Sequence, residues 1–278
     1  MPARLRPDIS DALFASLAHL GFQRFSPHPG LLSWVQCYWI AQQPDWSSEP
    51  VSETVYPDGG STLIFNFSAD NDPPIIFNSL QTTRQMRFGG QVQRLGIRFQ
   101  PGGAFQLLNV VMQEVIDGDS ALDDVSTPRL RSSLRRLCAQ LSETTPTQQR
   151  LSLIDQWLLK RAETATHGMV QAVFPSLMNA QESIDALSSQ LPISRRQLER
   201  KFQQEVGASP AQLQQLHRIK LARALISSHP EQSLTRIGQD AGFYDQAHFN
   251  RRFQRVTGLT PGEYRLKKMS QKYNSIPD

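Results

Sequence analysis

The last third of the chain contains one segment twice. Residues 193–213, ISRRQLERKFQQEVGASPAQL, align with residues 244–264, YDQAHFNRRFQRVTGLTPGEY, at a constant offset of 51 positions. The identical pairs are Arg200 and Arg251, Phe202 and Phe253, Gln203 and Gln254, Gly207 and Gly258, and Pro210 and Pro261. A repeat at fixed spacing indicates one supersecondary unit that occurs twice.

Each copy carries the signals that begin and end a helix. Ser194 and Asp245 are good N-caps, because their side-chain oxygens accept from the free N–H groups of a first turn. Gln197, three residues after Ser194, completes the pattern of a capping box. Gly207 and Gly258 suit the left-handed position that follows a helix. We therefore expect two helices of about twelve residues.

Apolar residues in each copy predict the buried side of these helices. The pairs spaced as hydrophobic staples at the helix start are Ile193 with Leu198 and Tyr244 with Phe249. Leu198 with Phe202, and Phe249 with Phe253, then form a stripe at i and i+4.

A shorter apolar pattern precedes each copy, marked by Ile184, Leu187 and Leu191 and by Leu234, Ile237 and Ala241. Two short helices joined by a tight turn are typical of a helix-turn-helix. We predict two such units, at about 183–207 and 233–258. Residues 211–227 between them predict one connecting helix of roughly 25 Å, close to the ~34 Å of one DNA turn once the widths of the recognition helices are added.

The outer faces of the two predicted recognition helices are polar and basic. The candidates for contacts with DNA bases are Arg195, Arg196, Glu199, Arg200, Gln246, Ala247, His248, Asn250 and Arg251. The candidates for phosphate contacts are Lys201, Gln203, Arg252, Gln254 and Arg255. Either face alone is typical of a solvated helix surface, whereas two faces in the same register favour a shared binding role.

Basic charge is concentrated in the same part of the chain. Residues 181–278 hold 15 lysines and arginines against 9 acidic residues, a net of +6, while the preceding 180 residues have a net of −2. The 278 residues are long for one domain. We therefore predict a nearly neutral domain over residues 1–170, with a role of its own, and a domain that binds a polyanion over residues 171–278.

From about residue 183 to residue 268 the chain resembles the double helix-turn-helix domain of AraC/XylS-type bacterial transcription regulators. The resemblance lies in Ile237, Gly242, Phe243, Asp245, Gln246, Phe249, Arg251 and Phe253, and then in Gly258, Thr260, Pro261, Tyr264 and Arg265. It implies promoter or operator DNA as a partner, and RNA polymerase as a second one. It places base contacts on Arg196, Glu199 and Arg200 in the first helix and on Gln246, Ala247, His248, Asn250 and Arg251 in the second.

One position departs from that family. Gly238 stands where the family more often has alanine. We expect this glycine to loosen its helix by up to ~1 kcal/mol without moving the outer face.

The first 170 residues predict a β core at about 25–105, followed by helices at about 106–165. Strand-like runs occupy residues 34–40, 61–67 and 93–99, and turn signals separate them. Residues 11–20 predict an N-terminal helix, and residues 162–179 predict the connector to the basic domain. The whole chain is thus α+β: an antiparallel β barrel or sandwich with flanking helices, then an all-α domain. This organisation resembles the cupin-like sensor domains of AraC-type regulators, and the run from residue 57 to 108 resembles an uncharacterised subgroup of them.

Catalytic chemistry is not indicated in the β core. It has neither histidine nor cysteine between residues 51 and 110, and the six histidines of the chain lack metal-ligand spacing. We expect no enzyme activity, no metal and no cofactor, and His248 as a DNA contact rather than a general base. The candidates for the lining of an effector pocket are Tyr38, Trp39, Phe65, Phe67 and Phe99, and plain core packing is the alternative for each.

The partners of the first domain remain open between two interpretations. The domain either senses a small molecule or acts, without a ligand, as a dimerisation or protein-interaction module. The leucine-periodic helix at 129–141 is either a homodimer surface, which the family resemblance favours, or a helix that packs on the β core. Without a signal peptide or a long apolar run, the chain is expected to be cytoplasmic, and its cysteines, Cys37 and Cys138, to be reduced.

Overall fold

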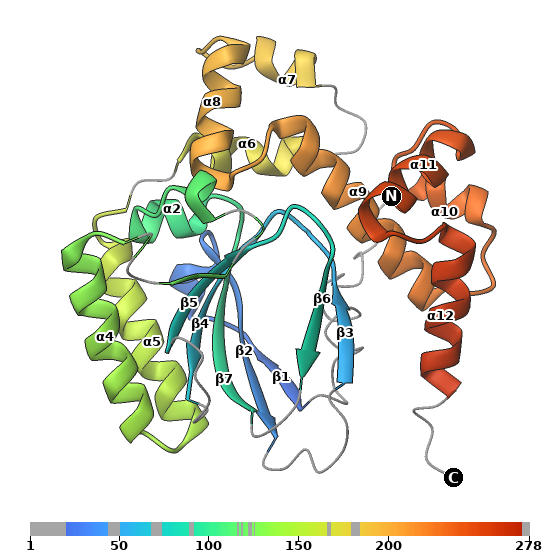
Figure 1. Ribbon diagram of the computed structural model, residues 1–278. Helices are drawn as coiled ribbons and strands as arrows, with labels where there is room; N and C mark the ends of the chain where they lie inside the picture. The colour runs from blue at the N-terminus through green and yellow to red at the C-terminus, as the bar shows by residue number, and fades with distance from the viewer. Residues whose placement is uncertain are drawn as a thin grey trace.

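The computed structural model describes residues 21–43, 51–67, 74–88, 92–115, 117, 119–121, 124, 126–165, 168–178 and 184–273. A β sheet with helices on one side forms the N-terminal part, and two helical lobes joined by a long helix form the C-terminal part (Figure 1). The helix predicted at residues 11–20 lies outside the described residues.

Six strands form one antiparallel sheet in the order β1-β2-β7-β4-β5-β8. Their bounds are Phe22–Phe25, Val35–Gln43, Val92–Phe99, Ser61–Asn66, Ile75–Ser79 and Asp119–Ala121. A separate antiparallel ribbon pairs β3, Val51–Val55, with β6, Arg84–Phe88. The three predicted strand runs are confirmed as β2, β4 and β7. Within the described residues the β core is a sheet with a separate ribbon rather than a closed barrel.

One face of the large sheet carries the main hydrophobic core. Short helices follow the strands at Pro29–Leu31 (η2), Gly103–Leu108 (α2) and Met112–Val115 (η3). Two longer helices, α4 (Pro128–Glu143) and α5 (Thr147–Ala162), cover the core face (Figure 1). Leu130, Leu134, Leu137 and Leu141 of α4 are buried in this core. The leucine face therefore packs inside the domain, which is the second of the two interpretations of this helix.

The other face of the sheet includes Trp39, because side chains alternate along β2. Gly96 is paired with Trp39 across the β2–β7 ladder. A Cβ atom on Gly96 would overlap the indole ring. The absence of a side chain at residue 96 is thus what leaves room for the indole ring against β7.

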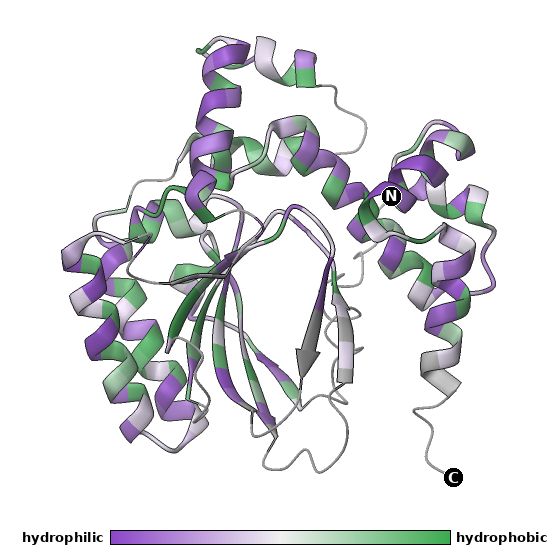
Figure 2. Cartoon of the chain, in the orientation of Figure 1, coloured by the Kyte–Doolittle hydropathy of each residue, from purple (hydrophilic) through white to green (hydrophobic). Residues whose placement is uncertain are grey.

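The C-terminal helices are α6 (Met169–Met178), α7 (Ile184–Ser189), α8 (Arg195–Val206), α9 (Pro210–Ser228), α10 (Leu234–Asp240), α11 (Gln246–Thr257) and α12 (Pro261–Tyr273). They form two apolar cores, and α9 contributes to both. Leu213 of α9 packs with Phe202 and Leu198 in the first core, while Ile219 and Ala222 lie with Phe249 in the second. Green apolar positions face inward in both lobes and purple positions face outward (Figure 2).

Both predicted recognition helices end as the sequence indicates. Ser194 and Gln197 form a capping box on α8, and the Asp245 carboxylate accepts from the His248 N–H at 2.7 Å on α11. Gly207 and Gly258 have φ angles of 78° and 76°, the left-handed conformation. The connecting helix is also confirmed, as α9.

Two local expectations change. Tyr244 is 97% exposed, so the predicted staple with Phe249 is wrong; Phe243 packs on Phe249 instead, with ring centroids 5.1 Å apart. The predicted connector contains helix α6, and Val170 and Val173 of this helix are buried in the first core of the C-terminal lobes.

Replacing Gly96 with alanine should destabilise the six-stranded sheet by about 1–3 kcal/mol, because the new methyl group overlaps the buried Trp39 ring. Denaturant unfolding of full-length protein measures the change. Gly262→Ala is the control, since nothing lies within 4 Å of a Cβ placed there. Equal stability of the two variants would contradict the packing described for Trp39.

Glu205 of α8 is buried against the N-terminal domain, where the Gln106 side chain of α2 donates to its carboxylate at 3.0 Å. Burial raises the pKa of Glu205, and the Gln106 bond and Lys201 offset part of this effect. Because its folded-state pKa is raised, Glu205 makes a contribution to stability that is fully present below its unfolded pKa of ~4.3 and is lost as pH rises through the folded value. Glu205→Gln should remove this loss, giving a flatter stability profile between about pH 4 and neutrality in denaturant unfolding; an unchanged slope would contradict it.

Candidate nucleic-acid interface

Helix α8 presents its predicted base contacts to solvent. Arg196, Glu199 and Arg200 are exposed on the side of the helix opposite Leu198 and Phe202, which are fully buried. Because the two buried side chains are one turn apart, they fix the rotation of the helix about its axis. The three exposed residues are therefore held on a surface that a DNA groove could reach.

Arg195 has partners of its own within the first unit. Its guanidinium contacts Asp185 of α7 at 2.5 Å and Glu199 of α8 at 3.3 Å. All three side chains are exposed, so solvent weakens these pairs and they can exchange for a DNA partner. Among the candidates on the first helix, Arg195 would therefore have to break its ion pairs before it could contact a DNA base.

Helix α11 places its candidates less uniformly. Gln246, Ala247 and Arg251 are exposed, whereas His248 and Asn250 are half-buried. The His248 ring lies edge-on to Phe243 at 5.8 Å, and its Nε2 accepts from Arg252 Nε at 3.1 Å. The Gln246 side chain accepts from the Thr235 hydroxyl of α10 at 2.9 Å. His248 therefore helps to join the turn to the helix in addition to its predicted DNA contact.

The predicted phosphate contacts also divide by position. Gln254 and Arg255 are exposed, and Lys201 and Arg252 are half-buried. Gln203 has its amide within 3.2 Å of both the Gly207 carbonyl and the Ser209 N–H, in the amide orientation that satisfies both. Gln203 thus supports the turn after α8, and its phosphate role stays a prediction.

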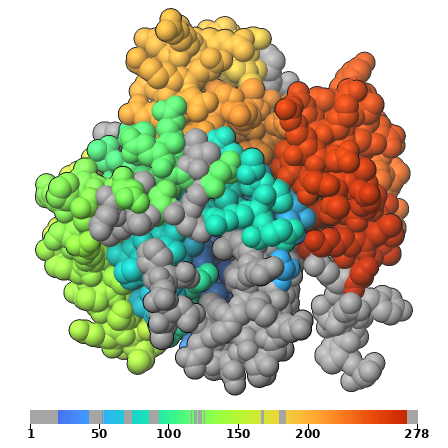
Figure 3. Space-filling view, viewed as in Figure 1, coloured from blue at the N-terminus to red at the C-terminus, as the bar shows by residue number. Residues whose placement is uncertain are grey.

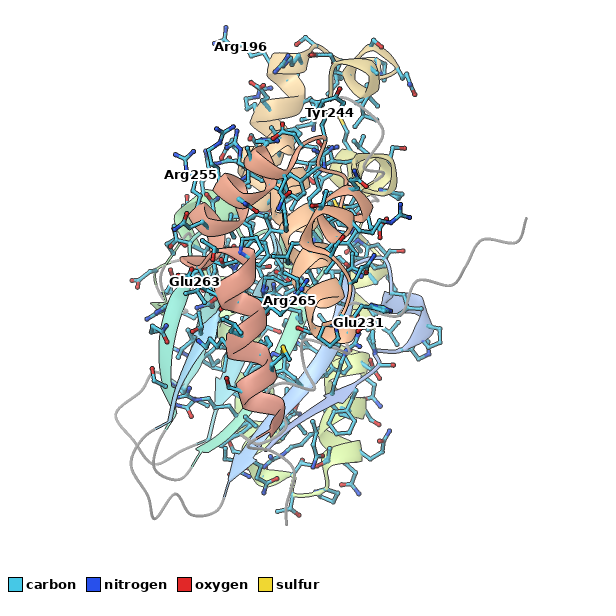
Figure 4. All side chains as sticks on the ribbon, turned by 90° about the vertical axis from the view of Figure 1, so that its right-hand side faces the viewer. Arg196, Glu231, Tyr244, Arg255, Glu263 and Arg265 are labelled. Atoms are coloured by element: carbon cyan, nitrogen blue, oxygen red, sulfur yellow. The ribbon has the colours of Figure 1, made fainter. Side chains whose placement is uncertain are left out.

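Sequence analysis missed one exposed aromatic on this surface. Tyr244 lies directly before the N-cap of α11, in the lobe that also carries Arg255, whereas Arg196 projects from the other lobe (Figure 4). The sequence did hold a signal for this exposure: Phe243 and Tyr244 are adjacent, and only one of the two can fill the single apolar position against Phe249.

The effector-pocket candidates do not share one cavity. Tyr38, Phe65 and Phe99 are fully buried on the core face of the sheet, and Trp39 lies on the opposite face. The Tyr38 hydroxyl donates to Asp155 of α5 at 2.6 Å, and burial followed by this carboxylate raises the pKa of Tyr38 well above its usual range. Phe67 is partly buried beneath the Arg150 guanidinium, 4.7 Å from its ring centre.

The face of the sheet that carries Trp39 is partly polar. Thr62 and Asn66 alternate along β4 with the core residues Leu63 and Phe65, and both are buried. Arg98 of β7 donates to the Thr62 hydroxyl at 2.8 Å. Many small-molecule sites combine a few buried polar groups with aromatic rings in this way.

Two features are absent from the described part of the chain. There, no three His, Cys, Asp or Glu side chains are grouped so that they could hold a metal ion. None of the helices in the same ranges is both long and apolar enough to span a membrane.

Two protein families match the chain. Residues 187–267 match a family described as a helix-turn-helix domain, and residues 23–120 match a domain of unknown function, DUF6597. Residues 187–267, in the C-terminal lobes, are therefore a helix-turn-helix domain.

Several curated proteins are similar to part of this chain. The arabinose operon regulatory protein of Escherichia coli K12 is 26% identical over 126 residues, covering 41% of this chain and 43% of that protein. The HTH-type transcriptional regulator ArgR of Pseudomonas aeruginosa is 32% identical over 99 residues, 35% of this chain and 30% of ArgR. The HTH-type transcriptional activator RhaS of Escherichia fergusonii is 34% identical over 84 residues, 30% of each. The chain thus spans less than half the length of these relatives.

Among solved structures, ToxT from Vibrio cholerae O395 aligns over 88% of this chain and 97% of its own, with 12% identity and a TM-score of 0.35.

Proposed function

We propose that this protein is a sequence-specific DNA-binding transcription regulator. The observation that carries the proposal is the duplicated unit: two recognition helices with matched caps and exposed polar faces, joined by the single helix α9. The 19 residues of α9 span about 28 Å, which is close to one turn of DNA at ~34 Å. The match of residues 187–267 to a helix-turn-helix domain, and the similarity of part of the chain to transcription regulators, support the same function.

Equivalent positions on the two helices have the chemistry for base contacts. Arg200 and Arg251 occupy the same place in the repeat, and arginine binds guanine O6 and N7 through two hydrogen bonds. Gln246 and Asn250 suit adenine N6 and N7. Lys201, Arg252 and Arg255 flank these residues and would contact phosphates, which set affinity rather than sequence preference.

The N-terminal domain has the role of controlling this DNA contact. Its partly polar, buried sheet face around Thr62, Arg98 and Trp39 favours a small-molecule effector. RNA polymerase and a second copy of the chain are the further partners that a regulator of this type would engage.

Arg251→Ala should lose about 1–3 kcal/mol of discrimination at one base pair, because the bidentate contact with guanine disappears. Binding of the variant to a wild-type-selected DNA sequence, and to single-base variants of it, measures this loss. Lys201→Ala is the matched control: it should weaken binding to all sequences alike and lower the salt dependence. If wild type discriminates between bases and Arg251→Ala discriminates equally well at every position, Arg251 does not contact a base.

Thermal unfolding of full-length protein against a metabolite library tests the sensor role. A ligand at about 100 times its Kd should stabilise the native state by about 2.7 kcal/mol. Thr62→Val should lose this effect if the ligand lies on the polar sheet face. The absence of any shift would instead support the ligand-independent interaction module.

A further inference from the structure

One loop of the sensor domain contacts both helix-turn-helix units. The turn between β5 and β6 contains Gln81 and Thr83, both half-buried. The Gln81 side-chain amide donates to the Gly207 carbonyl, and the Thr83 hydroxyl donates to the Val256 carbonyl. In Figure 3 the teal surface of this part of the sensor adjoins both the orange and the red surfaces of the DNA-binding lobes.

The two acceptors lie at the same end of equivalent helices. Gly207 directly follows α8, and Val256 is in the last turn of α11, two residues before Gly258. Gly207 and Gly258 are partners in the 51-residue repeat. The last backbone carbonyl groups of a helix lack the usual N–H partner four residues on, so their lone pairs can accept from other donors; at Gly207 the Gln203 amide is one such donor. The loop therefore supplies donors to the C-terminal ends of both recognition helices.

The loop itself is tied to the sensor framework. The backbone N–H groups of Gln81 and Thr82 donate to one Asp117 carboxylate oxygen at 2.7 and 2.8 Å. Asp117 has a left-handed φ of 54°, and its own N–H donates to the Ser79 carbonyl at the end of β5. Gln81 and Thr83 are thus presented from a backbone held on two sides.

Neighbouring sensor residues contact the helix between the two units. Asp58 accepts from Arg98 of β7 and, at 3.0 Å, from Lys220 of α9. The Tyr56 ring lies 3.7 Å from the Arg223 guanidinium, also on α9. These contacts hold the middle of α9 on the sensor domain. The loop therefore needs to fix only the C-terminal ends of α8 and α11.

The two units have separate apolar cores, and α9 joins them. A single connecting helix sets their distance, but it leaves bending and twisting between them. We propose that Gln81 and Thr83 set the relative orientation of α8 and α11, and so determine which spacing between the two DNA segments the protein accepts. This inference rests on the proposed DNA-binding function and names a specificity device outside the DNA-binding domain.

One inserted base pair would displace the second DNA segment by roughly 3.4 Å and rotate it by about 34°. A protein with fixed helix orientation cannot follow this change, whereas a protein with freer units can. The double variant Gln81→Ala/Thr83→Val should therefore tolerate altered spacing better than wild type. Thr82→Ala is the matched control, because its side chain is exposed in the same loop.

The experiment uses DNA selected by full-length wild type from a random pool, and versions with one base pair inserted or deleted between the two contacted segments. Wild type and Thr82→Ala should each lose at least about tenfold in affinity on the altered spacing. The double variant should lose less than about threefold, while it still unfolds cooperatively on heating. A double variant that discriminates spacing as wild type does would overturn the inference while leaving DNA binding intact. If wild type selects no sequence at all, the proposed function fails first, and the inference fails with it.

Discussion

The sharing of α9 between two cores is the constraint on which the C-terminal half depends. Leu213 packs with Phe202 in one core, and Ile219 and Ala222 pack with Phe249 in the other. Each recognition helix is too short to be stable by itself, so each needs this packing to form. The same buried residues that stabilise the units therefore also set the distance between their exposed faces.

Polar contacts, rather than a continuous apolar core, join much of the sensor domain to α9 and to the ends of the recognition helices. Asp58 lies between the cations of Arg98 and Lys220, and burial lowers the pKa of Arg98 to about 10. Interfaces of this polar kind allow domains to move relative to each other. A ligand on the sheet face could act on this contact directly, because Arg98 binds both Thr62 on that face and Asp58 at the interface.

Features encoded over short distances could be predicted from the sequence. The caps at Ser194 and Asp245, the glycines that end both helices and three of the six strands of the sheet all follow local rules, and the structure confirms them. The sequence could not predict which of two adjacent aromatic residues packs on Phe249. Phe243 and Tyr244 are both suited to that position, and only the path of the turn decides that Phe243 is buried.

Tertiary contacts also changed the meaning of single residues. Gly238 was expected to loosen its helix, but a Cβ there would lie 3.0 Å from the Phe249 ring, so the glycine also permits close packing. The aromatic strand residues could not be divided between core and pocket, because the sequence does not say which face the helices α4 and α5 cover. The loop at Gln81 and Thr83 left no local signal, since its partners are more than a hundred residues away.

Hydroxyl-radical footprinting of full-length protein on a DNA sequence that it selects tests the central claim most directly. Two recognition helices joined by α9 should protect two segments on the same face of the duplex, with centres about one helical turn apart. One protected segment, or two segments on opposite faces, would contradict the account of a matched pair of DNA-reading units.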